Sequence, residues 1–212
     1  MKKCYVITSH IEGDPKKIIA PSAHDLIICA DGGYEIAVSI GITPDFIIGD
    51  SDSGEMQPAY GSKTKVIRFP TDKDESDTYL CVKHAVDLGF KDIVIAGGIG
   101  GRLDHTISNI QTLAHFSNKA NIALVDENEF VTVVENSSVT LQKRDGFFVS
   151  LFSLSDKSIG VTTKGLAYPL DNAELNNSYP VGLSNEFIAP EAIVEVKSGK
   201  LLIIMSAAKR IE

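Results

Sequence analysis

The stretch that decides the fold is residues 26–50, LIICADGGYEIAVSIGITPDFIIGD. Two apolar runs, LIICA at 26–30 and DFIIG at 45–49, enclose a helical pattern at 34–40. Short runs that are apolar almost throughout are typical of strands buried on both faces of a sheet. Strands of this kind that alternate with helices predict an α/β unit with a mainly parallel sheet.

The same alternation extends through the first half of the chain. Further buried strands are predicted at 4–8, 65–69 and 92–96. Further helices are predicted at 76–88 and 103–116, where apolar residues recur with helical spacing. We therefore expect an N-terminal α/β domain, residues 1–130, in which helices cover both faces of a mainly parallel sheet.

The second half of the chain has a different pattern. After residues 121–129 no segment has a convincing helical period, and turn-forming clusters such as ENSS and KRDG separate short β-rich pieces. These pieces are FVTVVE (130–135), SVTLQ (138–142), FFVSLFSL (147–154), IGVTT (159–163), AIVEVKS (192–198) and KLLIIMSA (200–207). Regular short strands are typical of a β-sandwich or barrel, and we expect an all-β sandwich domain at 131–212.

Composition limits the classes of function. The 212 residues are 43% hydrophobic and 23% charged, as in ordinary globular proteins, and carry a formal net charge of -8. This acidity argues against nucleic-acid or anionic-membrane partners, which need basic patches. Neither the first residues nor any later stretch predicts a signal peptide or a membrane span. Three cysteines without CxxC spacing, in apolar surroundings, are expected to be buried and reduced, which fits a cytoplasmic protein; they are Cys4, Cys29 and Cys81.

Acidic motifs follow three of the predicted strands. They are ADGG with Asp31, GDSDS with Asp50 and Asp52, and PTDKDESD with Asp72, Asp74 and Asp77. Ligands of open α/β sheets bind at the carboxyl ends of the strands, and carboxylates gathered there repel one another unless a cation lies among them. Oxygen ligands with few histidines favour magnesium. The alternative is that these are loop carboxylates and helix caps, for which the start of the 76–88 helix is well suited.

A glycine-rich turn, GGIGGRLDH at 97–105, follows the strand at 92–96 and opens a helix. Glycines let the backbone approach a phosphate, the helix start supplies free N–H donors, and Arg102 adds a forked cation. Asp104 could bind a ribose hydroxyl, orient Arg102 or favour the helix dipole. The turn is neither a P-loop nor a dinucleotide fingerprint. With the acidic motifs, it indicates a nucleoside triphosphate as ligand. His105 is either a catalytic residue or a hydrogen-bonding residue at the helix start.

Taken in order, ADGG, GDSDS, TDKDESDT and GGIGGRLDH resemble the motif series of bacterial thiamine pyrophosphokinases. TKGLAYPL at 163–170 and GLSNEF at 182–187 resemble that family's thiamine-side motifs. The resemblance implies a catalytic α/β domain, a thiamine-binding β-sandwich and a homodimer with active sites between subunits. It also implies Mg²⁺-dependent transfer of the pyrophosphoryl group of ATP to thiamine, which gives thiamine diphosphate and AMP.

The resemblance implies three sets of site residues. The magnesium-binding set is Asp50, Asp52 and Asp77, which with Arg102 also forms the expected catalytic set. The set expected to bind the co-substrate ATP is Asp31, Lys73, Asp74, Arg102 and Asp104. Some members of the family carry an uncharged polar residue in place of Lys73, which could contact either phosphate or thiamine. The set expected to bind thiamine is Asp77, Tyr168, Ser184 and Asn185. Eukaryotic members use a tryptophan against thiamine, and this chain has none. Tyr168 could supply a stacking face instead, or be a core or turn residue beside Pro169.

Two other readings stay open. One is a magnesium-dependent kinase or phosphohydrolase that acts on another small substrate, and the other is a non-catalytic sensor of thiamine or nucleotide. Product analysis separates the enzymes, because pyrophosphoryl transfer releases AMP and ordinary phosphorylation releases ADP.

Overall fold

The computed structural model describes residues 2–50 and 63–208. The chain divides into two compact units, each described by itself below. Unit 1 comprises Met1–Thr112 and Ile122–Glu127, and unit 2 comprises Leu113–Asn121 and Asn128–Glu212. In the described part of the chain, no helix has the length and apolar character needed to cross a membrane.

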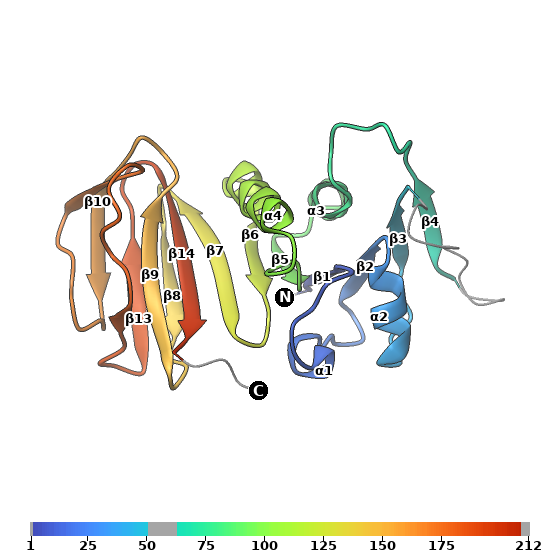
Figure 1. Ribbon diagram of the computed structural model, residues 1–212, viewed down its shortest axis with the longest axis horizontal. Helices are drawn as coiled ribbons and strands as arrows, with labels where there is room; N and C mark the ends of the chain where they lie inside the picture. Colours follow the sequence, from blue (N-terminus) through green and yellow to red (C-terminus); the bar gives the residue numbers. More distant parts are fainter. Residues whose placement is uncertain (1, 51–62, 209–212) are drawn as a thin grey trace. The chain divides into compact units, whose positions relative to one another are not determined.

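Unit 1 is built on a sheet with the strand order β6-β5-β1-β2-β3-β4 (Figure 1). Its strands are β1 (Cys4–Ile7), β2 (Leu26–Ala30), β3 (Phe46–Gly49), β4 (Lys65–Arg68), β5 (Asp92–Ala96) and β6 (Asn121–Val125). The pairs β1–β2, β1–β5, β2–β3 and β3–β4 are all parallel. The strands predicted in this half begin and end within one residue of the observed bounds, because each is a short apolar run.

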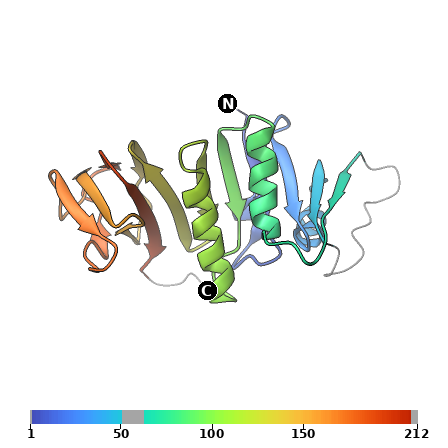
Figure 2. The same cartoon turned by 90° about the horizontal axis from the view of Figure 1, so that it is seen from above.

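Helices cover both faces of this sheet, as predicted. They are α1 (Pro15–Ile18), α2 (Gly33–Ser39), α3 (Asp77–Asp87) and α4 (Leu103–Phe116), the last of which ends in unit 2. Tyr5 and Ile7 of β1 pack in one apolar cluster with Ala37 of α2 and Ile18 of α1. Helix α3 lies on the opposite face, as Figure 1 and Figure 2 show, and buries a stripe that includes Cys81.

Helix α3 begins and ends where its sequence indicates. The Ser76 hydroxyl accepts a hydrogen bond from the Tyr79 N–H at 3.2 Å, which caps the first turn. After Leu88 the chain passes through Gly89 at φ 89°, a left-handed conformation that suits glycine at a helix end. Ser76 therefore fixes the start of α3, immediately before Asp77.

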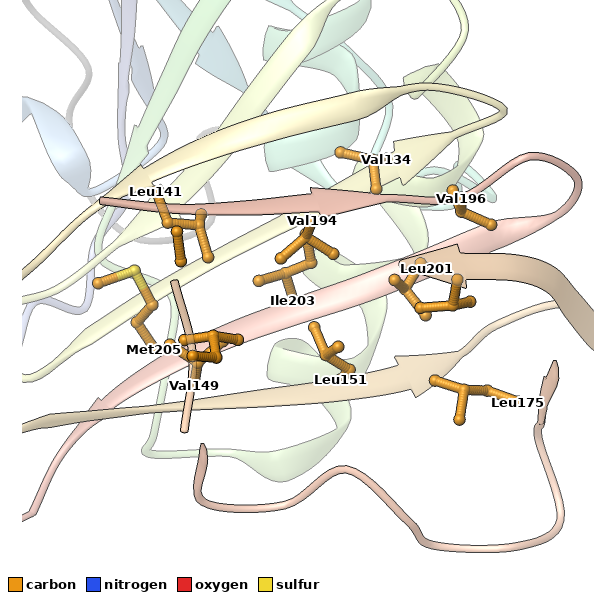
Figure 3. Packing of buried hydrophobic residues seen from close by; sticks show 13 residues of the cluster. Val134, Leu141, Val149, Leu151, Leu175, Val194, Val196, Leu201, Ile203 and Met205 are labelled. Atoms are coloured by element: carbon orange, nitrogen blue, oxygen red, sulfur yellow. The ribbon is translucent and has the colours of Figure 1, made fainter. Parts of the chain in front are cut away.

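Unit 2 contains two antiparallel sheets, and its residues 128–208 form no helix. The strand orders are β12-β9-β14-β7 and β11-β10-β13-β8. The bounds are β7 (Glu129–Glu135), β8 (Ser138–Gln142), β9 (Phe147–Ser153), β10 (Lys157–Lys164), β11 (Ala173–Asn176), β12 (Asn185–Glu186), β13 (Glu191–Glu195) and β14 (Lys200–Ala207). Figure 3 shows the apolar core, where Leu201 and Ile203 of β14 meet Leu151 of β9 and Val194 of β13. The predicted β-sandwich is confirmed.

Candidate active site

Three aspartates from separate parts of unit 1 meet in space. Asp31 follows β2, Asp50 follows β3 and Asp77 begins α3, and one carboxylate oxygen of each lies within 4.8 Å of the others. They converge because the carboxyl ends of parallel strands lie at the same edge of a sheet. Asp52, the fourth expected member, lies outside the described residues.

The backbone around Asp31 is shaped to present its carboxylate. Asp31 has φ 43°, a left-handed conformation that is uncommon outside glycine, and its N–H donates to the Ile48 carbonyl at 2.9 Å. Gly49 allows the close approach, since a Cβ there would lie 3.0 Å from the Asp31 Cβ. The Asp31 Oδ1 atom is buried and accepts a hydrogen bond from none of the described residues. Such an unsatisfied carboxylate oxygen is costly unless a ligand binds it.

Lys73 lies among the three aspartates. Its Nζ is 3.0 Å from Asp50 Oδ2 and 3.1 Å from Asp77 Oδ1, and its side chain is only 10% exposed. Burial disfavours the charged ammonium, but the hydrogen bonds and attraction of Asp50 and Asp77 outweigh it and raise the pKa of Lys73. The ammonium therefore neutralises part of the acidic cluster.

Asp77 has a pKa above that of an ordinary aspartate. Burial raises its pKa, and the negative charges of Asp50 and Asp31 add to the increase, whereas Lys73 opposes it. Asp77 Oδ1 is buried and lies 3.1 Å from the Lys73 ammonium, with which it forms an ion pair. A carboxyl with a raised pKa can accept a proton near neutral pH more readily than an ordinary aspartate.

The donor set fits a magnesium ion. Three carboxylates offer hard oxygen ligands, and the buried Asp31 Oδ1 atom has no hydrogen-bond donor among the described residues. A helix-cap role accounts for the place of Asp77 in the first turn of α3, but it does not account for Asp31. Asp72 and Asp74 are exposed in the turn before α3 and do not belong to the three-residue cluster.

The glycine-rich turn after β5 packs tightly against its own chain. Gly97, Gly98, Gly100 and Gly101 all have positive φ, between 57° and 81°. A Cβ on Gly97 would lie 2.1 Å from the His10 carbonyl oxygen, and one on Gly98 would lie 2.5 Å from the Asn109 side chain. These glycines are therefore required for the fold of the turn itself, in addition to any role near a phosphate.

A cavity of about 390 Å³ lies beside this turn. It is lined by Thr8, Ser9 and His10 after β1, Gly98, Gly100, Gly101 and Arg102 after β5, Thr78 of α3, and His105 and Asn109 of α4. In the strand order, β1 and β5 are neighbours whose connections leave in opposite directions, and such a switch point is where open α/β sheets bind ligands. Thr78 follows Asp77 in the chain, so the cavity adjoins the acidic cluster.

Arg102 and Asp104 form a two-point ion pair at the start of α4. Arg102 Nη2 lies 2.6 Å from Asp104 Oδ2, and Nε donates to Oδ1 at 3.2 Å. The hydrogen bond to Arg102 lowers the pKa of Asp104, and Asp104 raises the pKa of Arg102 in turn. Of the three roles that the sequence leaves open for Asp104, the structure displays the orientation of Arg102 at the cavity wall.

Three of the four predicted thiamine-side residues, Tyr168, Ser184 and Asn185, lie in unit 2, whereas Asp77 lies in unit 1. The Asn185 side chain is buried, accepts from the Tyr168 N–H at 3.0 Å and donates to the Tyr168 carbonyl at 2.7 Å. Tyr168 itself is 71% exposed, so it is a turn residue and not a core residue. Ser184 has φ 55°, and its N–H donates to the Ser150 hydroxyl at 3.1 Å. The Asn185 side chain therefore holds the Tyr168 backbone in place through two hydrogen bonds.

Sequence reasoning missed several residues of the cavity, namely Thr8, Ser9, His10 and Thr78. A signal was present, because the segment TSH follows the first strand and lies at the same edge of the sheet as the acidic motifs. Asn109 of α4 holds the turn by donating from Nδ2 to the Gly98 carbonyl at 2.9 Å.

An α/β unit with an acidic cluster beside a polar cavity, followed by a β-sandwich, belongs to the class of nucleotide-binding transferases. Residues 20–125 match the family model "Thiamin pyrophosphokinase, catalytic domain", and residues 136–203 match "Thiamin pyrophosphokinase, vitamin B1 binding domain". The chain belongs to the thiamine pyrophosphokinase family, whose activity is the transfer of the pyrophosphoryl group of ATP to thiamine. The resemblance seen in the sequence is thereby confirmed.

Relatives and solved structures agree with this assignment. The thiamine pyrophosphokinase of Bacillus subtilis is 26% identical over 206 residues, which cover 92% of this chain and 96% of the relative. Thiamine pyrophosphokinase 1 of Oryza sativa is 27% identical and covers 84% of this chain and 77% of its own length. The crystal structure of the Bacillus subtilis enzyme matches with a TM-score of 0.84 at 25% identity, over 98% of this chain and all of that chain.

Proposed function

We propose that this chain is a magnesium-dependent enzyme that transfers the pyrophosphoryl group of ATP to thiamine, with the ion held by Asp31, Asp50 and Asp77. The observation that carries the metal site is the convergence of these three carboxylates, together with the buried Asp31 Oδ1 atom, which no described donor satisfies. Asp52 is proposed as a further ligand from its place in GDSDS. Magnesium, when bound, would neutralise negative charge on the polyphosphate.

The polar cavity at the β1–β5 switch point supports a nucleotide site in unit 1. Arg102, oriented by Asp104, would stabilise the negative charge that develops on the phosphate chain during transfer. Lys73 and Asp74 are also proposed on the nucleotide side. Lys73 would hold Asp50 and Asp77 in place, and its ammonium would add positive charge beside a phosphate bound at the cluster.

The reaction proposed is an in-line displacement. The thiamine hydroxyl oxygen forms a bond to the β-phosphorus. The bond from that phosphorus to the oxygen that joins it to the α-phosphorus breaks, and AMP leaves with the electron pair. Asp77 would take the hydroxyl proton. Such transfers depend mostly on the position of the reactants and on charge neutralisation, which the acidic cluster and Arg102 would supply.

The remaining parts of the proposal concern thiamine, domains and assembly. Tyr168 would stack on thiamine, with Ser184 and Asn185 shaping that face of the sandwich. We assign catalysis to residues 1–130 and thiamine binding to 131–212. Family resemblance supports a homodimer with active sites between subunits. Buried free cysteines support a cytoplasmic location, and the net charge of -8 argues against nucleic-acid or membrane partners.

The test is product analysis with a matched pair of variants. Protein, ATP, Mg²⁺ and thiamine should give equal amounts of AMP and thiamine diphosphate. Asp50→Asn should abolish turnover without unfolding the protein. Asp72→Asn removes an exposed carboxylate outside the cluster and should leave turnover unchanged. Near-normal turnover in Asp50→Asn would refute the metal role, ADP as product would indicate an ordinary kinase, and binding without product would indicate a sensor.

A further inference from the structure

The segment between β1 and α1, residues 8–14, is fastened to the end of β6 by a buried carboxylate. Asp126 is only 3% exposed, and its Oδ2 accepts the Glu12 N–H at 3.1 Å. Its Oδ1 accepts the Glu127 N–H at 3.1 Å. Burial raises the pKa of Asp126, although both N–H donors oppose the increase. A buried carboxylate costs free energy, and its two hydrogen bonds to backbone N–H groups offset part of that cost. The buried position of Asp126 therefore indicates a structural or functional role.

The other end of this segment is fastened to the glycine-rich turn. The Gly98 N–H donates to the His10 carbonyl at 2.7 Å, and the His10 carbonyl also accepts from the Thr8 hydroxyl at 3.1 Å. The His10 ring lies against Gly101, where an added Cβ would be 3.3 Å from the nearest ring atoms. His10 is therefore fixed on one side by the glycine turn and, two residues later at Glu12, by Asp126.

This arrangement places an imidazole in the cavity wall. His10 lines the cavity with Arg102 and His105, so three side chains that can donate hydrogen bonds share one space. His10 lies at the surface. Its position depends on the hydrogen bond from the Gly98 N–H to its carbonyl and on the hydrogen bond from the Glu12 N–H to Asp126. A ligand that makes polar contacts is sensitive to small displacements of such a group.

We propose that Asp126 is a positioning residue for nucleotide binding, acting through the 8–14 segment to hold His10 against the glycine turn, where His10 contacts the bound nucleotide. The inference rests on the proposed function, because it takes the cavity to be the ATP site. Asp126 does not line the cavity, so its effect is exerted through the backbone that carries His10. The two residues should therefore act as one unit.

The test compares His10→Ala, Asp126→Asn and the double variant. Asparagine keeps one acceptor oxygen and loses the other, so one of the two backbone N–H groups is released. Each single variant should raise KM for ATP about tenfold, the size expected for one lost hydrogen bond to a charged ligand. KM for thiamine and kcat should stay within about twofold of wild type, since neither residue lies at the acidic cluster. In the double variant, KM for ATP should equal that of His10→Ala alone.

Glu127→Gln is the matched control. Glu127 Oε2 accepts the Asp14 N–H at 3.0 Å, and the side chain pairs with Lys17, so it holds the far end of the same segment. It does not line the cavity, and KM for ATP should not change. Titration of each variant with α,β-methylene ATP by calorimetry gives the affinity without turnover.

The outcomes separate the two proposals. A double variant whose increase in KM for ATP is the product of the two single increases, about a hundredfold, or an unchanged KM in His10→Ala, would overturn the inference. Should Asp126→Asn fail to fold, His10→Ala and the analogue titration still decide whether His10 contacts the nucleotide. A wild-type protein that binds the analogue but forms no thiamine diphosphate would overturn the proposed function, and the effects of His10 and Asp126 on analogue affinity would remain measurable.

Discussion

Replacement of Lys73 by methionine should expose the repulsion within the acidic cluster. The ammonium lies 3.0 Å from Asp50 and 3.1 Å from Asp77, and at an effective dielectric constant of about 20 each pair has a gross attraction of about 5 kcal/mol. Desolvation of the mostly buried ammonium offsets much of this energy. Loss of one partner from a buried ion pair costs about 3–5 kcal/mol. We expect Lys73→Met to lower the free energy of unfolding by about 3 kcal/mol, the lower end of that range, because Asp77 is partly exposed.

Magnesium should reverse part of this loss. A divalent cation competes with the Lys73 ammonium for the same carboxylates. Magnesium should therefore bind Lys73→Met more tightly than it binds the wild-type protein. Urea unfolding in chelator and then at saturating Mg²⁺ measures both effects. Lys83→Met, which removes an exposed ion pair with Asp87 on the same helix, should leave the stability and its Mg²⁺ dependence nearly unchanged. Equal stabilisation of wild type and Lys73→Met by Mg²⁺ would refute the reasoning.

Three further results are expected. Burial lowers the pKa of His84 below 6.5, so the folded protein favours the neutral ring and should lose stability as pH falls from about 6.5 through the lowered pKa. In urea unfolding at several pH values, His84→Gln should flatten this pH dependence of stability, and an unchanged dependence would contradict the assignment. Asn185→Ala removes the hydrogen bonds to the Tyr168 backbone and should lower the free energy of unfolding by about 2 kcal/mol. It should also raise KM for thiamine but not for ATP, and equal changes in both KM values would argue against a thiamine-side role. Ile203→Ala empties the centre of the sandwich and should lower the free energy of unfolding by about 2–5 kcal/mol, and a loss below about 1 kcal/mol would mean that the core collapses to fill the space.

The sequence predicts the central elements of unit 1 well. Strands β2 and β5 and helix α4 have the predicted bounds, because near-continuous apolar runs and helical spacing leave little choice. Helix α1 escapes prediction because four residues cannot show a period; it forms where Asp14 caps the chain ahead of Pro15. Strand β11, AELN, escapes because it is short and polar at the edge of its sheet.

The candidate site is predictable only in part. Convergence of Asp31, Asp50 and Asp77 follows from strand direction, which the apolar pattern already indicates. The place of Lys73 does not follow, because an ion pair depends on how a loop folds and not on spacing. His10 likewise reaches the cavity through a carbonyl bonded to Gly98, a contact between residues 88 apart in the chain that one sequence cannot reveal.

The three cysteines provide a way to observe how unit 1 opens. Cys4, Cys29 and Cys81 are completely buried, and burial raises the pKa of the Cys29 thiol to about 12. Only a thiolate reacts quickly with oxidants and alkylating reagents, so the folded chain should resist both. Strands β1 and β2 and helix α3 carry one thiol each, and labelling of any of them requires a transient breach of the core beneath the acidic cluster. Labelling rates measured by mass spectrometry would thus give the rate at which the core of unit 1 opens, with and without bound nucleotide.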